Sequence, residues 1–137
     1  MKTRVTLDYI LVCEDIRQEV GRKPSAMGIF TDNIYVKDFP IFFPKLCFLF
    51  HLNVVGGAGP FRLDVEFRYN DKCVKTLVKD RQIKVLKGST GLILNFIITP
   101  FTSQTPGEGQ LIVRLDGKTH RRKFSVSKPK DASVFER

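Results

Sequence analysis

Few side chains in the sequence could carry out hydrolytic or metal-dependent chemistry, and they are widely spaced. A catalytic or metal centre needs His, Cys, Asp or Glu side chains that converge on one point. The chain has two histidines, His51 and His120, and neither has a potential ligand shortly downstream. Cys13, Cys47 and Cys73 form no Cys-x-x-Cys pair, and no nucleophile-elbow, zincin, Walker or kinase motif is present. We therefore expect no enzymatic activity, no catalytic residue, no metal and no cofactor.

These residues are better explained as parts of a fold. His51 lies within an apolar segment, and we expect it to be a half-buried structural histidine. The three cysteines fall on separate expected strands, where they would act as small hydrophobic residues. The acidic pair Glu14-Asp15 could serve acid–base catalysis. A salt-bridged turn with the nearby Arg17 is the commoner use of such residues, and we expect that role here.

The cationic side chains are more suggestive of a binding function. The net charge is +9, with a balance of +1 over residues 1–68 and of +8 over residues 69–137. Clustered cations could bind the phosphates of a nucleic acid or of another polyanion, with strongly salt-dependent affinity. A solvated, charge-stabilised surface is the simpler interpretation. The candidate anion-binding residues are Lys72, Lys75, Lys79, Lys84, Arg114, Lys118, Arg121 and Lys123.

An apolar segment at residues 39–44 is the candidate for a protein interface. It reads Phe-Pro-Ile-Phe-Phe-Pro, and two adjacent Phe residues cannot both face one core from a regular strand. Exposed apolar patches tend to be interfaces, formed here by edge-strand pairing or a symmetric dimer. Alternatively, the segment covers the end of the core. The candidate interface residues are Phe39, Ile41, Phe42 and Phe43.

Alternating patterns predict the strands that position these residues. Residues 61–69 alternate apolar and charged side chains, which is typical of an antiparallel strand with one buried face. Residues 46–55 predict a central strand, and Asp116-Gly117 predicts the turn of a C-terminal β-hairpin. This hairpin would place Arg114, Arg121 and Lys123 on one outer face. Residues 14–23 suit a long loop or hairpin connection, and further strands are expected at 5–13, 25–30, 34–36, 73–79, 82–86 and 91–99.

These patterns together predict an all-β fold, an antiparallel two-sheet sandwich of the immunoglobulin-like type with eight or nine strands. A barrel is the alternative. We expect a single domain over residues 1–127 and a loosely tethered tail over residues 128–137. The odd number of cysteines and the lack of a secretory signal indicate a reducing compartment, so we expect a cytoplasmic protein. No segment approaches the ~18 apolar residues of a membrane span, and we expect no membrane association.

Two sequence motifs resemble those of a known family. The first is Cys13-Glu14-Asp15-Ile16-Arg17-Gln18-Glu19, followed by Gly21, Lys23, Ser25 and Gly28-Ile29-Phe30, and the second is Pro44-Lys45-Leu46-Cys47-Phe48. They resemble an uncharacterised prokaryotic family that is catalogued only as a domain of unknown function. The resemblance implies a compact β-rich domain and no assigned activity, so it supplies no functional residues.

The leading functional hypothesis from the sequence is a non-enzymatic cytoplasmic interaction module. It would act through the segment at residues 39–44, in a homo-oligomer or with another protein partner. Binding of nucleic acid or another polyanion through the basic C-terminal hairpin and the cations of residues 72–87 is the alternative. An enzyme of unrecognised type is the third possibility.

Overall fold

The computed structural model describes residues 4–56 and 59–135, and within these ranges the fold is all-β. A single short 3₁₀ helix follows the last strand of the described chain. The elements are β1 (Arg4–Gln18), β2 (Pro24–Phe30), β3 (Asn33–Tyr35), β4 (Ile41–Phe43), β5 (Leu46–Val55), β6 (Pro60–Tyr69), β7 (Lys72–Lys84), β8 (Gly91–Ile98), β9 (Phe101–Ser103), β10 (Gly107–Leu115), β11 (Lys118–Ser127) and η1 (Ala132–Phe135).

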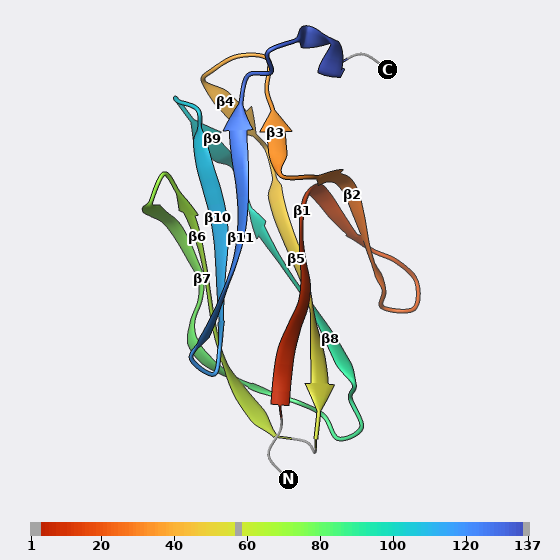
Figure 1. Ribbon diagram of the computed structural model, residues 1–137. Coiled ribbons are helices and arrows are strands. Elements are labelled where there is room, and N and C mark those ends of the chain that lie inside the picture. Colours follow the sequence, from red (N-terminus) through yellow and green to blue (C-terminus); the bar gives the residue numbers. More distant parts are fainter. Residues whose placement is uncertain (1–3, 57–58, 136–137) are drawn as a thin grey trace.

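Two large sheets form the two layers of the molecule (Figure 1). The four-stranded sheet has the order β2-β1-β5-β8, and the five-stranded sheet has the order β3-β11-β10-β6-β7. A small third sheet pairs β4 with β9. All pairs are antiparallel except β3, which runs parallel to β11. The predicted all-β class is therefore confirmed, although the described residues hold eleven strands instead of eight or nine, because β4 and β9 are short additional strands.

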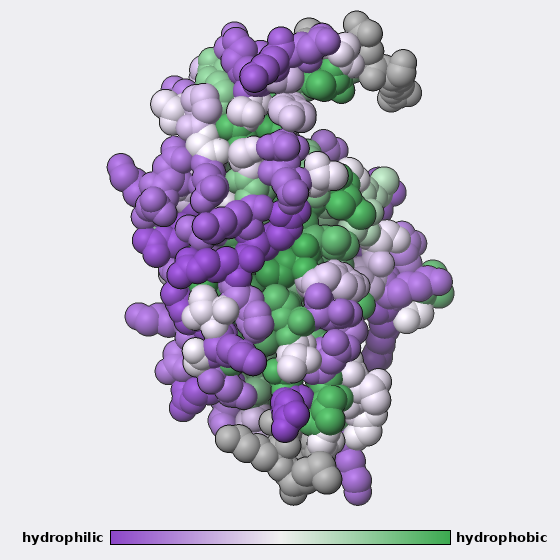
Figure 2. All heavy atoms as spheres, viewed as in Figure 1, coloured by the Kyte–Doolittle hydropathy of each residue, from purple (hydrophilic) through white to green (hydrophobic). Residues whose placement is uncertain are grey.

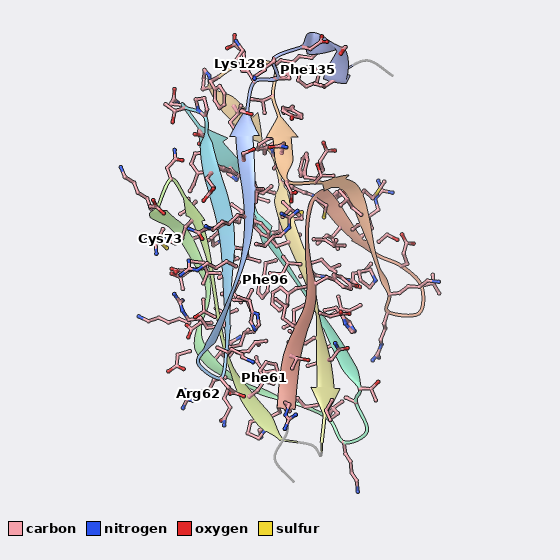
Figure 3. All side chains as sticks on the ribbon, in the orientation of Figure 1. Phe61, Arg62, Cys73, Phe96, Lys128 and Phe135 are labelled. Atoms are coloured by element: carbon pink, nitrogen blue, oxygen red, sulfur yellow. The ribbon has the colours of Figure 1, made fainter. Side chains whose placement is uncertain are left out.

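The core lies between the two large sheets. On β6, Phe61 and Phe67 are buried, as the alternating pattern predicts. Figure 3 shows Phe61 in the space between the sheets and Arg62 on the outer side. The ring centroid of Phe48 on β5 lies 5.3 Å from that of Phe67, so aromatic contacts join the two layers. A pair of this kind contributes about 0.5–1.5 kcal/mol beyond the area it buries.

The predicted C-terminal hairpin is confirmed, with Leu115 opposite Lys118 across a two-residue turn. Asp116 and Gly117 have φ values of 48° and 84°, the left-handed geometry of a type I′ turn. The Asp116 carboxylate also accepts a hydrogen bond of 2.8 Å from the backbone N–H of Arg62. The turn is thereby fixed to β6, which sets the position of the hairpin cations.

Two strands are longer than the sequence predicts. β1 continues past Cys13 to Gln18 and pairs with β2, forming a two-stranded arm where a loop or hairpin connection was expected. β7 joins the two segments expected at 73–79 and 82–86 into one strand, with three irregularities in its pairing with β6. Among the described residues, no helix is long and apolar enough to cross a membrane.

Candidate interaction surfaces

The apolar segment at residues 39–44 mainly covers the end of the core. Ile41 is buried, and Phe39 and Phe43 pack against the core residues. The Phe43 ring centroid lies 6.2 Å from that of Phe101, on the strand that follows β8. Phe42 points outward and is 64% exposed. Pairing of β4 with β9 turns alternate side chains inward, so of the four candidate interface residues Phe42 alone presents a largely exposed side chain.

The cations of the C-terminal hairpin share one outer face, as the sequence predicts. Arg121 lies opposite Ile112 and Lys123 opposite Gln110 in the ladder of β10 and β11, which places both on the same face as Arg114. Lys118 lies at the start of β11, beside the turn. The remaining candidate cations lie on β7, and β6 separates that strand from the hairpin. These cations are Lys72, Lys75, Lys79 and Lys84.

Acidic side chains of β6 interrupt the basic surface. The Glu66 carboxylate lies 3.5 Å from the Arg114 guanidinium and 3.9 Å from that of Arg68. Arg121 donates a hydrogen bond of 3.2 Å to the Gln110 side chain. Ile112, on the same outer face, is completely buried among these residues. This face is thus a charged network in which several cations already have partners.

The outer surface of the four-stranded sheet is apolar instead. Pairing aligns its outward residues in rows across β1, β5 and β8. The rows are Tyr9–His51–Ile93, Leu11–Leu49–Asn95 and Cys13–Cys47–Ile97, and Ile29 of β2 lies beside Cys13. These ten residues are called the outer apolar face below. The sequence analysis did not identify this surface as a candidate site.

The outer apolar face has a buried centre and an exposed rim. Cys13, Cys47 and Leu49 are buried, although they point away from the core between the sheets. On the rim, the exposed fractions are 42% for Tyr9, 54% for Ile29, 45% for Ile93 and 41% for Ile97. The rim therefore offers several large apolar side chains to a partner.

The hydrophobic character of the molecule also differs between its sides. Figure 2 shows hydrophilic residues over β10 and β11, and a strip of hydrophobic residues between β11 and β1, where the two sheets are open toward the viewer. On this side β2 pairs with β1 only from Val12 onward, so the first half of β1 is a free sheet edge. Val5, Leu7 and Ile10 are consequently half-buried at the margin of the core.

His51 is held by its neighbours on β1. Its Nδ1 atom lies 3.1 Å from the Asp8 carboxylate, and its ring stacks on Tyr9 with centroids 5.6 Å apart. Its side chain is 25% exposed, in agreement with the prediction of a half-buried histidine. These contacts position Tyr9 and give His51 a structural role in the outer apolar face.

The two buried thiols lie side by side beneath the arm. Cys13 lies opposite Cys47, and their thiols donate to the backbone carbonyls of Asp15 and Glu14, respectively. Burial raises the pKa of the Cys13 thiol. Burial, with a smaller effect of neighbouring Cys13, raises the pKa of Cys47 to about 11. Both thiols are therefore protonated near neutral pH and are poor nucleophiles.

The acidic cluster of the arm forms ion pairs. Asp15 accepts a hydrogen bond of 3.3 Å from Lys45 and lies 3.9 Å from Arg17. It also accepts the backbone N–H of Ile16, as expected for a structural carboxylate. Across residues 4–56 and 59–135, the structure brings together no group of three or more His, Cys, Asp or Glu suited to holding a metal ion.

Solved structures resemble this fold at low sequence identity. A β-glucosidase from Erythrobacter marinus, EmGH1, matches with a TM-score of 0.52 and 11% identity over 90% of this chain. A β-glucosidase from Listeria innocua matches with a TM-score of 0.49 and 11% identity over 92% of this chain. The chain spans only 15% and 16% of those two proteins. At this identity, the first match supports the fold alone.

No curated protein matches the sequence. A family model does match, and it covers most of the chain, from residue 8 to residue 127. The expected resemblance to an uncharacterised domain is thereby confirmed: the chain belongs to the family of unknown function DUF6941.

Proposed function

We propose that this protein is a non-enzymatic interaction module that binds a protein partner through the outer apolar face. One observation carries the proposal. β5 and β8 are apolar on both faces, with Phe48 and Phe96 inward and Leu49, Ile93 and Ile97 outward. Strands with this composition are usually covered on both faces. Here the core covers one face, while the rim of the other stays exposed.

The chemistry of this surface supports a protein partner. Its rim residues are large and apolar, and the contact of His51 with Asp8 lies at one margin. Clusters of aromatic and aliphatic side chains with few charges are typical of the centre of protein interfaces. A partner that presents its own apolar sheet or helix face would remove this area from water, which is favourable by about 25 cal/mol per Å².

A photo-cross-linking experiment in the producing cells tests this proposal. A benzophenone amino acid would replace Tyr9 on the outer apolar face and, as the matched control, the exposed Thr119 on the outer face of the other sheet. We expect a protein adduct at position 9, lost when Ile29→Lys is added, and none at position 119. Equal adducts at both positions, or none at either, would contradict the proposal.

The proposal includes an immunoglobulin-like sandwich as the fold. In that fold, strands A, B and E belong to one sheet and strands C, F and G to the other. The order β1-β5-β8 agrees with the first sheet and the order β11-β10-β6 with the second. A crystal structure with β6 in the same sheet as β5 would refute this assignment.

The proposal also retains the cytoplasm as the location, supported by three free cysteines. Detection of the protein outside the cell would contradict it.

Polyanion binding is the second candidate, favoured by exposed lysines. Within the part of the chain that the structure describes, Lys72, Lys75, Lys79, Lys84 and Lys123 have no ion-pair partner. Fluorescence anisotropy with labelled oligonucleotides tests it. We expect affinity to fall with salt, with a log–log slope of roughly −0.9 per phosphate contact on duplex DNA. Arg121→Ala with Lys123→Ala should weaken binding, and no binding at low salt would exclude this function.

A further inference from the structure

β8 is an edge strand that lacks the usual protection against pairing with another chain. It borders the four-stranded sheet, with β5 on one side and no strand of the described chain on the other. Its sequence, Gly-Leu-Ile-Leu-Asn-Phe-Ile-Ile, contains neither charge nor proline. Its pairing with β5 runs without a bulge from Leu46↔Ile98 to Asn53↔Gly91. Long, regular, apolar edges of this kind are templates for strand addition.

β7, an edge strand of the five-stranded sheet, has features that protect it against pairing with another chain. β7 carries five cations along its length, and its register with β6 shifts at three points. Lysines and bulges on an edge strand discourage pairing with another sheet. β8 has neither device, so these two edge strands differ in their capacity to accept a further strand.

The sequence of β8 is also complementary to itself. In an antiparallel pair of two copies centred on Asn95, Ile93 would lie opposite Ile97 on the outer face. On the inner face, Leu92 would lie opposite Ile98, and Leu94 opposite Phe96. Apolar side chains would thus lie opposite apolar side chains, and Asn95 opposite Asn95. If the centre of the pairing were shifted by one residue, Asn95 would lie opposite an isoleucine.

The side chains of β8 are incompletely buried, so a second copy of the strand could cover them. Leu92, Leu94 and Phe96 point inward yet are only partly buried, because the sheet ends beside them. On the outer face, Ile93 and Ile97 remain exposed. A second β8 would cover these side chains from the edge and would satisfy the free backbone groups of the strand.

We propose that two copies of this chain pair through β8 as a symmetric antiparallel dimer, with the two-fold axis at Asn95. The two four-stranded sheets become one continuous sheet with the order β2-β1-β5-β8-β8-β5-β1-β2. At the axis the two Asn95 side chains face each other, and each amide has both a donor and an acceptor to offer the other. The dimer goes beyond the proposed function, because it pairs the backbone groups at the edge of the sheet, although Ile93, Asn95 and Ile97 of β8 also belong to the outer apolar face.

Charge substitutions at the axis test this pairing. Asn95→Asp places two carboxylates opposite each other in the dimer, and Asn95→Lys places two ammonium groups there. One strand edge is smaller than a standard interface of about 1,600 Å², so we expect a dimer that dissociates in the range of roughly 1 to 100 µM. Each variant should raise the dissociation constant at least about tenfold, since like charges directly across a ladder repel. Sedimentation velocity over this concentration range measures the change.

Mixing the two Asn95 variants is the decisive part of the experiment. An equimolar mixture of Asn95→Asp and Asn95→Lys should form a mixed dimer about as stable as that of the wild type, because opposite charges then meet at the axis. Val74→Lys on β7 is the matched control, since Val74 is 47% exposed and Ile93 is 45% exposed. We expect Ile93→Lys to weaken the dimer and Val74→Lys to leave it unchanged. Circular dichroism melting curves establish that each variant is folded.

Each outcome bears on the two proposals separately. A wild-type protein that stays monomeric at every concentration overturns the β8 dimer, as does a dimer that both Asn95 variants leave intact. A mixture that fails to re-form a dimer overturns the position of the axis. Because Tyr9 lies on β1, two strands away from β8, a cross-link from position 9 to a different protein would support the proposed function even if β8 stays unpaired.

Discussion

Each large sheet carries an outward-pointing isoleucine, on the inner strand β10 in one sheet and on the edge strand β8 in the other, and the surroundings of the two side chains differ. Ile112 of the five-stranded sheet is completely buried, whereas Ile97 of the four-stranded sheet is 41% exposed. The cross-strand neighbours of Ile112 are Arg121 and Glu66, whose long stems can cover an apolar side chain. Within the described chain Ile97 has a cross-strand neighbour on one side only, because β8 is an edge strand, and that neighbour, Cys47, is too short to cover it.

This difference indicates how the outer face of a sheet becomes polar or keeps exposed apolar side chains. The five-stranded sheet covers its outer face with its own charged residues, and ion pairs such as Glu66 with Arg114 hold them in place. The four-stranded sheet has short or apolar residues at the corresponding positions, and the large apolar side chains at the rim of its outer face stay exposed. The edges repeat the contrast, because β7 is charged and irregular while β8 is apolar and regular.

The most direct test of the comparison makes the same substitution on both faces. Ile112→Ala should lower the free energy of unfolding by about 2–4 kcal/mol, because it leaves a cavity under packed side chains. Ile97→Ala should cost less than about 1 kcal/mol in the monomer, since the side chain already contacts water. Chemical denaturation at low protein concentration measures both, and equal losses would mean that the two faces are covered alike.

Removing the charge network tests what keeps the five-stranded face solvated. Glu66→Gln should lower the free energy of unfolding by about 1 kcal/mol, because a half-buried carboxylate loses two arginine partners. The control is Asp80→Asn, which removes an exposed pair with Arg62 and should cost no more than about 0.5 kcal/mol. The effect of Glu66→Gln should shrink in high salt, and a salt-independent loss would point to packing instead.

The buried thiols of the apolar face predict a sensitivity to alkaline pH. The pKa of Cys47 is about 11 in the folded protein against 9.0 as its ordinary value, so the unfolded chain loses this proton first. The free energy of unfolding should therefore fall as the pH rises from about 9 to about 11, and the effect should be complete above that range. Cys47→Ala should reduce this slope in pH-dependent denaturation curves. An unchanged slope would mean that the Cys47 thiol is not its source.

The smallest expected change in folding stability concerns the protected edge. Replacing Lys72, Lys75, Lys79 and Lys84 by Gln should alter the free energy of unfolding by less than about 0.5 kcal/mol, since all four are exposed. It should nevertheless increase association in light-scattering measurements, because the lysines discourage pairing at β7. The control with the same loss of charge replaces Lys23, Lys87, Lys118 and Lys130, which lie outside β7. Equal association of both variants would assign the effect to net charge.

Local patterns in the sequence predicted much of the fold. The alternation over residues 61–69 gave β6, and Asp116-Gly117 gave the hairpin, since both signals depend on neighbouring residues alone. The extension of β1 to Gln18 was less predictable, because its polar residues are stabilised by pairing with β2. The segment at residues 39–44 was identified as apolar, but the burial of Ile41 depends on β9, more than fifty residues away.

The outer apolar face was likewise not predictable from local sequence patterns. Residues 46–55 visibly carry apolar side chains at alternate positions on both faces, which was a usable signal for a second covered surface. Residues 46–55 alone could not show whether other parts of the same chain cover that surface. It depended on Tyr9, Ile29, Ile93 and Ile97, which come from three strands distant in sequence.

The sequence by itself determined the all-β class, the hairpin and the family, because alternation, turn chemistry and motifs are properties of neighbouring residues. Tertiary structure decided which of the two faces of β5 would join the core between the sheets, which cations would meet carboxylates, and which strands would end as edges. These outcomes depend on register between strands far apart in the chain. A shift of one residue in that register would exchange the two faces of a strand, so surface chemistry follows from pairing and not from composition.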